Sequence, residues 1–314
     1  MVTRQLKAVL DLGTNTFHLL IAEMSEGSFI EIFQKQTPVK IGAGGINKGF
    51  IEQMAYERGM RALEDFANIL TSYSIESIVA TGTSAIRNAR NGPQFLQEAK
   101  ERFGFSIESI PGALEAELIF KGVKQSFQFP ETPVLIMDIG GGSVEFIIAK
   151  NDAILYKQSF EIGAARLLDL FKPSNPIEVS ELESINTYLQ NTLKPLQDAL
   201  QKTSELYGKM EILVGSAGSF ETLLDVLKLD LGRNYDSITP FAHEVRKEQV
   251  AEFSKYIINS TQLQRESMKG VLDFRVDMIV VATVLLSFVV EKYSFNKIIA
   301  SNYALKEGLL FYSS

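Results

Sequence analysis

The residues with the clearest chemical potential lie in one short segment, Asp138-Ile-Gly-Gly-Gly-Ser-Val-Glu145. Successive glycines let the backbone approach a ligand closely and turn several N–H groups toward it, and a serine hydroxyl adds another donor. Such a loop suits a phosphate, although a flexible hairpin tip would have the same composition. The candidate phosphate contacts here are Gly140, Gly141, Gly142 and Ser143.

Carboxylates on both sides of this loop could hold a hard cation. Asp138 and Glu145 lie seven positions apart across a turn, so both can face the loop from neighbouring strands. Magnesium prefers a few carboxylates, water molecules and substrate phosphate oxygens. We therefore predict a Mg²⁺ site at Asp138 and Glu145, together with Asp11, which precedes a similar turn. The alternative is that each aspartate only caps its own turn.

A second anion-binding turn is predicted at Asp11-Leu-Gly-Thr-Asn15, where two side chains replace glycines of the first motif. Backbone amides and side-chain donors would both face the ligand there. His18 occupies the place of Glu145 in this copy, and we expect a packed or surface strand histidine rather than a catalytic one. The candidate phosphate contacts are Gly13, Thr14 and Asn15.

Two charged residues lie near the starts of helical patterns. Arg87 follows a buried strand and several small hydroxyl residues, where helix amides and an arginine fork could together hold phosphate oxygens. Glu115 falls in the first turn of another helix that follows a strand. A carboxylate there could be the general base for water attacking a terminal phosphorus, although glutamate at a helix start commonly only compensates the helix dipole.

A third small-residue turn, Val214-Gly-Ser-Ala-Gly-Ser-Phe220, joins a predicted strand to a predicted helix. It could receive phosphate or ribose at Gly215, Ser216 and Gly218, or could reflect tight packing alone. Further along the chain, Arg275 and Asp277 flank an apolar helix, where a buried or interdomain ion pair is the default expectation.

An internal repeat relates the two main motifs. Leu10-Asp-Leu-Gly-Thr-Asn-Thr-Phe-His-Leu-Leu-Ile-Ala-Glu23 aligns without gaps with Met137-Asp-Ile-Gly-Gly-Gly-Ser-Val-Glu-Phe-Ile-Ile-Ala-Lys150. In each copy an apolar strand ends in Asp-x-Gly and an apolar return strand follows, which predicts a β-hairpin. Asp11 and Asp138 are therefore equivalent.

Strands alternate with helices in both halves, so the fold class is α/β. We expect strands at 29–39, 75–81, 107–110, 154–160, 211–216 and 297–301, and a loop at 82–88. We expect helices at 50–70, 112–123, 164–171, 178–205, 217–228, 278–290 and 303–311, and a further helix that follows the loop and ends near 103.

A duplicated hairpin with acidic turns, followed by α/β elements, is the layout of the actin, sugar kinase and heat-shock ATPase (ASKHA) superfold, whose domains are ribonuclease H-like. We predict two actin-like domains related by internal duplication, with the active site in the cleft between them. Domain I spans residues 1–125 and domain II residues 126–302. The C-terminal helix, 303–314, is expected to pack back on domain I.

Composition narrows the possible partners. The 314 residues carry a net charge of -7 and no cysteine. Thiolate chemistry and disulfides are therefore excluded, and no basic surface is available for duplex nucleic acid or an anionic membrane. No secretory leader pattern is recognisable, so a cytoplasmic location is expected. A homodimer is expected because it is the commonest symmetric assembly.

The chain resembles the exopolyphosphatase/guanosine pentaphosphate phosphohydrolase (Ppx/GppA) family along nearly its whole length. The resemblance rests on segments in the family's order: Asp11-Leu-Gly-Thr-Asn-Thr-Phe, Thr83-Ser-Ala-Ile-Arg-Asn-Ala, Gly112-Ala-Leu-Glu-Ala, Asp138-Ile-Gly-Gly-Gly-Ser-Val-Glu, Glu161-Ile-Gly-Ala-Ala-Arg-Leu and Ser301-Asn-Tyr-Ala-Leu-Lys-Glu-Gly-Leu-Leu.

The resemblance implies roles for several residues. Glu115 would be the catalytic base, Glu145 a second essential carboxylate, Asp138 a magnesium-associated residue and Arg87 a phosphate clamp. It also implies the short two-domain form of the family. Where the family usually shows Ser-Gly-x-Glu-Glu-Ala-Arg, this chain has Pro111-Gly-Ala-Leu-Glu-Ala-Glu117. Two of these departures, Leu114 and Glu117, would change the charge near the base.

Several functions remain open at this point. The resemblance favours an exopolyphosphatase acting on inorganic polyphosphate, with guanosine pentaphosphate (pppGpp) as the alternative substrate. An ATP-dependent kinase of the same superfold would need an adenosine loop, for which only 215–219 is available. A non-catalytic nucleotide or alarmone sensor would bind phosphates without hydrolysing them.

Overall fold

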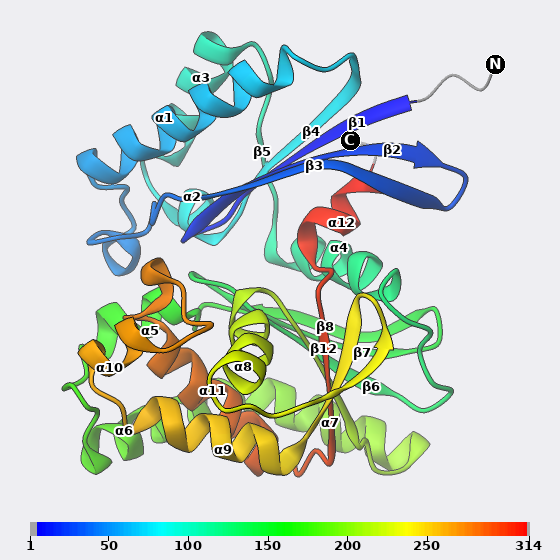
Figure 1. The fold of residues 1–314 in the computed structure, drawn as a ribbon, viewed down its shortest axis with the longest axis vertical. Helices are drawn as coiled ribbons and strands as arrows, with labels where there is room; N and C mark the ends of the chain where they lie inside the picture. The colour runs from blue at the N-terminus through cyan, green and yellow to red at the C-terminus, as the bar shows by residue number, and fades with distance from the viewer. Residues whose placement is uncertain (1–4, 313–314) are drawn as a thin grey trace.

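Two β-sheets, one in each half of the chain, form the framework of the protein (Figure 1). The computed structural model describes residues 5–312; the predicted ranges 1–125 and 303–314 each extend beyond the described residues, at 1–4 and 313–314. The first sheet has the order β3-β2-β1-β4-β5, with β1 (Gln5–Leu12), β2 (Thr16–Ser25), β3 (Ser28–Pro38), β4 (Ile75–Gly82) and β5 (Glu108–Ser109). The second has the order β10-β11-β12-β9-β6-β7-β8, with β6 (Val134–Ile139), β7 (Val144–Lys150), β8 (Ala153–Phe160), β9 (Ile212–Ser216), β10 (Asp236–Thr239), β11 (Ala242–Arg246) and β12 (Lys297–Ser301).

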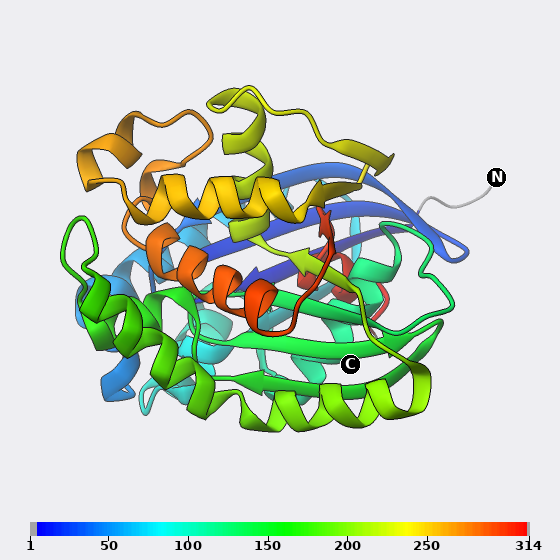
Figure 2. The same cartoon turned by 90° about the horizontal axis from the view of Figure 1, so that it is seen from below.

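Helices surround both sheets. In the first half, α1 (Gln53–Leu70) and α3 (Gly92–Phe103) pack together. In the second half, α11 (Ile279–Lys292) packs against α9 (Lys247–Ile258) and α6 (Val179–Thr192), and the view from below shows α9 and α11 side by side (Figure 2). The helices are α1 (Gln53–Leu70), α2 (Ser84–Asn88), α3 (Gly92–Phe103), α4 (Gly112–Lys124), α5 (Ala164–Phe171), α6 (Val179–Thr192), α7 (Lys194–Tyr207), α8 (Gly218–Leu229), α9 (Lys247–Ile258), α10 (Gln262–Ser267), α11 (Ile279–Lys292) and α12 (Leu305–Leu310), with short 3₁₀ turns η1 (Ile46–Lys48) and η2 (Asp273–Arg275).

The two halves repeat the same hairpin with the same register. Asp11 on β1 lies opposite His18 on β2, and Asp138 on β6 lies opposite Glu145 on β7. Both aspartates also face a parallel neighbour that carries a hydroxyl residue, since Asp11 pairs with Thr81 and Asp138 with Ser216. The predicted hairpins are therefore present, and the ungapped alignment reflects equivalent positions in space.

The central strands are apolar on both faces because each face is covered. Along β1, Leu10 packs in the core of the first half, while Val9 packs in a third cluster between the sheets; along β6, Met137 and Ile136 divide in the same way. Strands buried on both faces read as continuous apolar runs. We call the third cluster the central core; its members include Val9, Leu20, Ile119, Ile136, Ile147 and Leu309.

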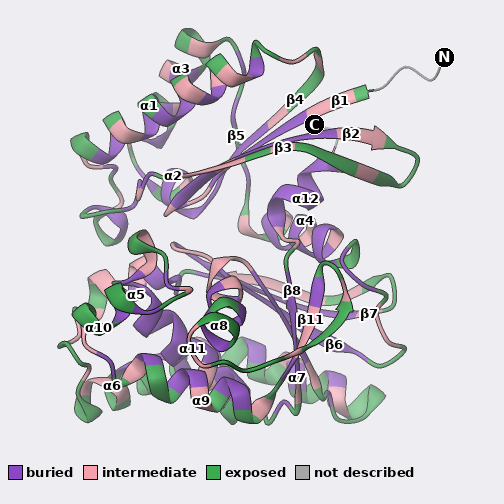
Figure 3. Cartoon of the chain, in the orientation of Figure 1, coloured by how far each residue is buried: buried purple, intermediate pink, exposed green. Residues whose placement is uncertain are grey.

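Helices α4 and α12 form the layer between the two sheets (Figure 1; purple in Figure 3). They cross at two glycines: a Cβ built on Gly308 would lie 1.8 Å from the carbonyl oxygen of Leu118, and one on Gly122 would lie 1.9 Å from that of Ala304. Helix α12 also contacts β1 and β2, while α4 contacts β7 and β8 of the second sheet. This layer therefore joins the two halves.

Three details of the predicted elements were wrong. The segment 82–88, expected as a loop, contains the short helix α2. The helix expected over 178–205 is two helices that meet at Leu193. Pro195 lies in the first turn of α7, where a proline is tolerated, but in the interior of one continuous helix it would break the backbone hydrogen bonding. The hairpin β10–β11 and the helices α9 and α10 were not predicted; β10 is short and largely exposed, so it lacks an alternating apolar signal.

The apolar segment 278–290 forms most of α11, which is buried along nearly its whole length. Among residues 5–312, no helix combines the length and apolar character needed to cross a bilayer.

We predict that Gly308→Ala lowers the free energy of unfolding. An alanine normally stabilises a helix relative to glycine, but here its methyl group would overlap backbone of α4 and force the helices apart, which typically costs about 1–3 kcal/mol. Urea unfolding followed by circular dichroism measures the change. Gln197→Ala, on the exposed face of α7, should stay within about 0.5 kcal/mol of wild type. Equal stability of the Gly308→Ala variant would contradict the tight crossing.

Candidate active site

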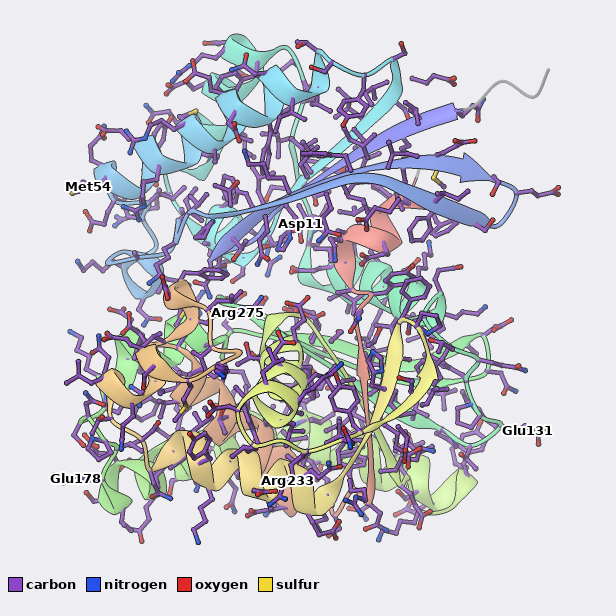
Figure 4. All side chains as sticks on the ribbon, viewed as in Figure 1. Asp11, Met54, Glu131, Glu178, Arg233 and Arg275 are labelled. Carbon is purple, nitrogen blue, oxygen red and sulfur yellow. The ribbon has the colours of Figure 1, made fainter. Side chains whose placement is uncertain are left out.

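A cleft with a cavity volume of about 160 Å³ lies where the two halves face each other. Asp11 at the edge of the first half and Arg275 at the edge of the second both line it (Figure 4). Of the predicted site residues, the cleft brings together Asp11, Gly13, Thr14, Asn15, Glu115, Asp138, Gly140, Gly141, Gly142, Ser143 and Gly218. The others, Arg87, Glu145, Gly215 and Ser216, do not line this cavity.

The glycines of the second hairpin are required by its close approach to the first half. A Cβ on Gly142 would lie 2.6 Å from the hydroxyls of both Thr14 and Ser84. A Cβ on Gly141 would lie 2.5 Å from the side-chain nitrogen of Asn15. The two predicted phosphate turns therefore face each other at contact distance, and a side chain at Gly141 or Gly142 would displace residues of the first half.

The three predicted metal ligands lie at the carboxyl ends of the hairpin strands, or directly beside them. Ser216 donates a 2.6 Å hydrogen bond to Asp138 Oδ2, and Ser159 donates one of 2.6 Å to Glu145 Oε1. Oδ1 of Asp11 is buried and has no hydrogen-bond partner. The first hairpin thus presents an unsatisfied carboxylate oxygen at the cleft, while the corresponding carboxylates of the second hairpin are partly satisfied by hydroxyls.

Burial and mutual repulsion raise the pKa values of these carboxylates. Burial, together with the negative charges of Glu115 and Asp138, raises the pKa of Asp11 to about 8. Burial raises the pKa of Asp138 to about 6, against the hydrogen bond from Ser216. Burial also raises the pKa of Glu145 well above its ordinary value, aided by Glu115 and Asp138. A bound cation would relieve this repulsion.

The donor set fits magnesium without forming a complete cage. Within residues 5–312, no three His, Cys, Asp or Glu side chains converge as a preformed metal site. Magnesium is usually held by one or two carboxylates and completes its shell with water and phosphate oxygens. The unpartnered oxygen of Asp11 and the buried carboxylate of Asp138 meet that requirement, and the Mg²⁺ assignment to Asp11, Asp138 and Glu145 stays a prediction.

Glu115 lies at the start of α4 and is buried against the cleft. Arg87 Nη1 donates a 2.7 Å hydrogen bond to Glu115 Oε2. Burial, with a smaller contribution from the charges of Asp138 and Glu161, outweighs the opposing effect of Arg87 and raises the pKa of Glu115 to about 7. A carboxylate with this pKa is divided between its two protonation states near neutral pH, as a general base should be.

Arg87 is engaged by carboxylates instead of facing the cavity. Besides Glu115, it donates to the carbonyl oxygen of Ile110 at 3.0 Å and to Glu161 Oε1 at 3.3 Å. In this structure its direct contacts therefore hold the candidate base in place. Its predicted role as a phosphate clamp stays a prediction.

The third small-residue turn is mostly occupied by packing contacts. A Cβ on Gly215 would lie 1.9 Å from the ring of Phe220, and one on Gly218 would lie 2.5 Å from the guanidinium of Arg275. Ala217 between them has a φ of 67°, a left-handed conformation that is rare for alanine. The predicted phosphate contacts of Gly215, Ser216 and Gly218 stay predictions.

Lys306 lines the cleft and was not among the predicted site residues. Its side chain is 10% exposed and forms a 2.8 Å ion pair with Glu307, which is 3% exposed. The positive charge of Lys306 partly offsets the rise in the pKa values of Asp11 and Asp138. A Lys-Glu pair within an otherwise apolar terminal helix was the signal that could have identified it.

Of the other polar residues considered in the sequence, His18 has a buried Nδ1 without a hydrogen-bond partner, whereas Arg275 and Asp277 are each paired. His18 lines the cleft from β2, and burial lowers its pKa to about 3, so its imidazole is neutral at physiological pH. Arg275 pairs with Glu221 at 2.8 Å, and Asp277 lies 3.7 Å from Lys40 of the first half. The expected ion pair near α11 thus exists as two pairs, one of which connects the two halves.

The two departures from the family pattern that change charge, Leu114 and Glu117, lie away from the cavity lining. Leu114 packs against the central core. Glu117 pairs with Lys157 at 2.7 Å and with Lys121 at 3.5 Å. Its charge is therefore balanced locally on the outer face of α4.

We predict that Lys306→Met strongly lowers the free energy of unfolding. The substitution would leave Glu307 buried without its partner, a change that typically costs about 3–5 kcal/mol. The double variant Lys306→Met/Glu307→Gln removes both charges and should regain most of the loss. Guanidinium unfolding of both variants at neutral pH tests this; a double variant no more stable than the single one would contradict it.

Comparisons with known proteins cover nearly the whole chain. The model of the Ppx/GppA phosphatase family matches residues 20–314. A solved exopolyphosphatase from Cytophaga hutchinsonii ATCC 33406 is 36% identical, with a TM-score of 0.92 over 98% of this chain and 97% of its own. A Haemophilus influenzae protein named for exopolyphosphatase activity is 27% identical over 97% of this chain and 90% of its own. An Aquifex aeolicus family member of known structure is 23% identical, with a TM-score of 0.77 over 98% and 96% of the two chains.

The similarity in structure extends over both sheets and the layer between them, which confirms the predicted α/β fold. The family match includes the second hairpin, the Glu115 helix and the terminal Lys306-Glu307 segment. On this basis the chain belongs to the Ppx/GppA phosphatase family.

Proposed function

We propose that the protein is an exopolyphosphatase that removes the terminal phosphate of inorganic polyphosphate by direct attack of water. The observation that carries the proposal is the position of Glu115, a buried carboxylate with a pKa near 7 that lines the same cleft as the two phosphate turns. The solved Cytophaga hutchinsonii relative, which is 36% identical, is named an exopolyphosphatase.

In this proposal Glu115 takes a proton from a water molecule. The water oxygen forms a bond to the terminal phosphorus while the bond to the bridging oxygen breaks, so no covalent enzyme intermediate is needed. Arg87 holds Glu115 in place through its 2.7 Å hydrogen bond. The turns at 13–15 and 140–143 bind the phosphate, and Lys306 contributes a fixed positive charge.

Asp11 and Asp138, with Glu145 behind them, are the residues that would hold Mg²⁺. When bound, the cation would neutralise phosphate charge and orient the terminal group. The unpartnered Asp11 oxygen and the raised pKa values of these carboxylates support this assignment.

A guanosine polyphosphate is the second candidate substrate, and one observation favours it. Phe274, Met278 and Ile279 line the part of the cleft formed by η2 and α11, and the neutral amides of Gln36 and Asn302 also line the cleft. An inorganic chain has no group that would use an apolar wall, whereas a nucleoside would.

We predict magnesium-dependent phosphate release that is lost in Glu115→Gln. The substitution removes the base without changing the shape of the side chain, so kcat should fall by about 10²–10⁴-fold. Release is measured from polyphosphate and from guanosine pentaphosphate, with magnesium or with a chelator.

Glu252→Gln, at an exposed ion pair with Arg233, is the control and should retain wild-type rates. No release by wild type from either substrate would favour a sensor; phosphate transfer from ATP instead would favour a kinase.

We also predict that activity falls on the acid side of pH 7. Glu115 acts only when unprotonated, and its pKa is raised to about 7, so kcat/KM should drop about tenfold per pH unit below that value. A pH profile of phosphate release at saturating magnesium measures this. An acid limb near pH 4–5, roughly the ordinary range of a glutamate, would show that another group or an unperturbed carboxylate limits the rate.

A further inference from the structure

The segment Glu161-Ile-Gly-Ala-Ala-Arg166 connects β8 to α5 and has no role in the proposed chemistry, yet it holds the glycine turn from behind. The N–H of Ala164 donates to the Gly140 carbonyl at 2.9 Å, and the N–H of Ala165 donates to the Gly141 carbonyl at 2.8 Å. In a planar trans peptide the N–H points opposite to the carbonyl. The amides that follow these carbonyls therefore point away from α5.

The third carbonyl of the turn is held from the same side. Gly142 accepts hydrogen bonds from the N–H of Gly163 at 3.2 Å and from Arg166 Nε at 3.0 Å. Gly163 has no room for a side chain, because a Cβ would lie 2.4 Å from the carbonyl carbon of Gly141. With all three carbonyls bound on one side, the amides of Gly141, Gly142 and Ser143 are presented on the other side as a group.

The carboxylate of Glu161 reaches the candidate base through a chain of hydrogen bonds. Its Oε2 accepts from Arg166 Nη2 at 2.6 Å and from the Ser84 hydroxyl at 2.7 Å, and its Oε1 accepts from Arg87 Nη2 at 3.3 Å. The other terminal nitrogen of Arg87 binds Glu115 at 2.7 Å. Glu161 thus shares Arg87 with the base and touches nothing in the cavity itself.

Arg166 also connects the segment to the first half of the chain. Its Nη1 donates to the Ile46 carbonyl at 3.2 Å and to Asn47 Oδ1 at 3.1 Å. Asn47 in turn donates to Asp169 Oδ2 on α5 at 2.8 Å. The same arginine therefore contacts the phosphate turn, Glu161 and the 3₁₀ turn η1 of the first half.

We propose that Glu161 and Arg166 form a positioning pair that orients the amides of the glycine turn and the base Glu115 relative to each other across the cleft. The proposal rests on the proposed phosphohydrolase function, which needs both groups at one phosphorus atom. Glu161 acts on the base through Arg87, and Arg166 acts on the turn through the Gly142 carbonyl. Neither side chain lines the cavity.

The test is Glu161→Gln, which keeps the side-chain shape. Glu161 accepts from two arginines, and a glutamine must turn its NH₂ group toward one of them, so this variant displaces Arg87 or Arg166. We expect kcat for phosphate release to fall about 10- to 100-fold, as for a small misplacement of a reacting group, while KM changes less than about threefold. Arg166→Lys keeps the charge but loses the planar fork, and its KM should rise because the glycine turn is loosened.

The control is Glu252→Gln, which breaks a comparable carboxylate–arginine pair away from the cleft and should leave kcat and KM unchanged. Unfolding midpoints of all variants establish that they are folded. Wild-type kcat in Glu161→Gln, in a preparation whose wild type is active and whose Glu115→Gln variant is not, would overturn the positioning role and leave the proposed function intact.

A crystal structure of Glu161→Gln tests the positioning pair independently of activity. The proposal requires a shifted Arg87 guanidinium and a changed Arg87–Glu115 contact, or a displaced Arg166 and Gly142 carbonyl. If wild type releases phosphate from neither substrate, the proposed function fails. The crystal structure then remains the test of whether Glu161 and Arg166 hold Arg87 and the glycine turn in position. Unchanged positions of both arginines and of the turn would refute it.

Discussion

Several carboxylates are buried in one place where the two halves of the chain meet, and the surrounding structure must compensate for their repulsion. Glu115, Asp138 and Glu145 are each less than 10% exposed, and an oxygen of Asp11 is buried without a partner. Burying a charge is costly unless it is paired or hydrogen-bonded. The pKa values raised above the ordinary range are the direct result.

The compensation comes from groups that are far apart in the chain. Arg87 binds Glu115, hydroxyls of Ser159 and Ser216 bind the carboxylates of the second hairpin, and Lys306 adds a buried positive charge. Among these carboxylates, Asp11 keeps a buried oxygen that no hydrogen bond satisfies. A site that is incompletely balanced in this way is suited to a cation that arrives with a phosphate substrate, because the two charges then enter together.

The two copies of the hairpin place equivalent aspartates at the site but differ in the residues of their turns. Both copies end a central strand in an aspartate beside a hydroxyl residue. The second copy has bare backbone in its turn, and the first fills the facing space with the side chains of Thr14 and Asn15. One turn thus supplies amides and the other supplies side-chain donors. The layer of α4 and α12 joins the halves behind the site, and it also carries both Glu115 and Lys306.

Local features were readable from the sequence alone. The two hairpins, the α/β alternation and the glycine turn follow from turn residues and apolar periodicity, which depend on neighbours close in the chain. The short hairpin β10–β11 escaped notice because its exposed strand lacks that periodicity. Glu115 stood out as a base only through the family resemblance, since a glutamate at a helix start is common.

Only the tertiary structure decided which groups act on one another. Arg87 and Glu115 are 28 positions apart, and Glu161 and Arg87 are 74 apart. Nothing in their local sequence shows that an arginine expected to clamp phosphate is shared by two carboxylates. The same holds for Lys306, which reaches the cleft because α12 returns from the second half to pack on α4 and β1. Charge interactions depend on distance in space and on burial, and both are properties of the folded chain, which is why the sequence identified the chemical groups while the fold determined their partners.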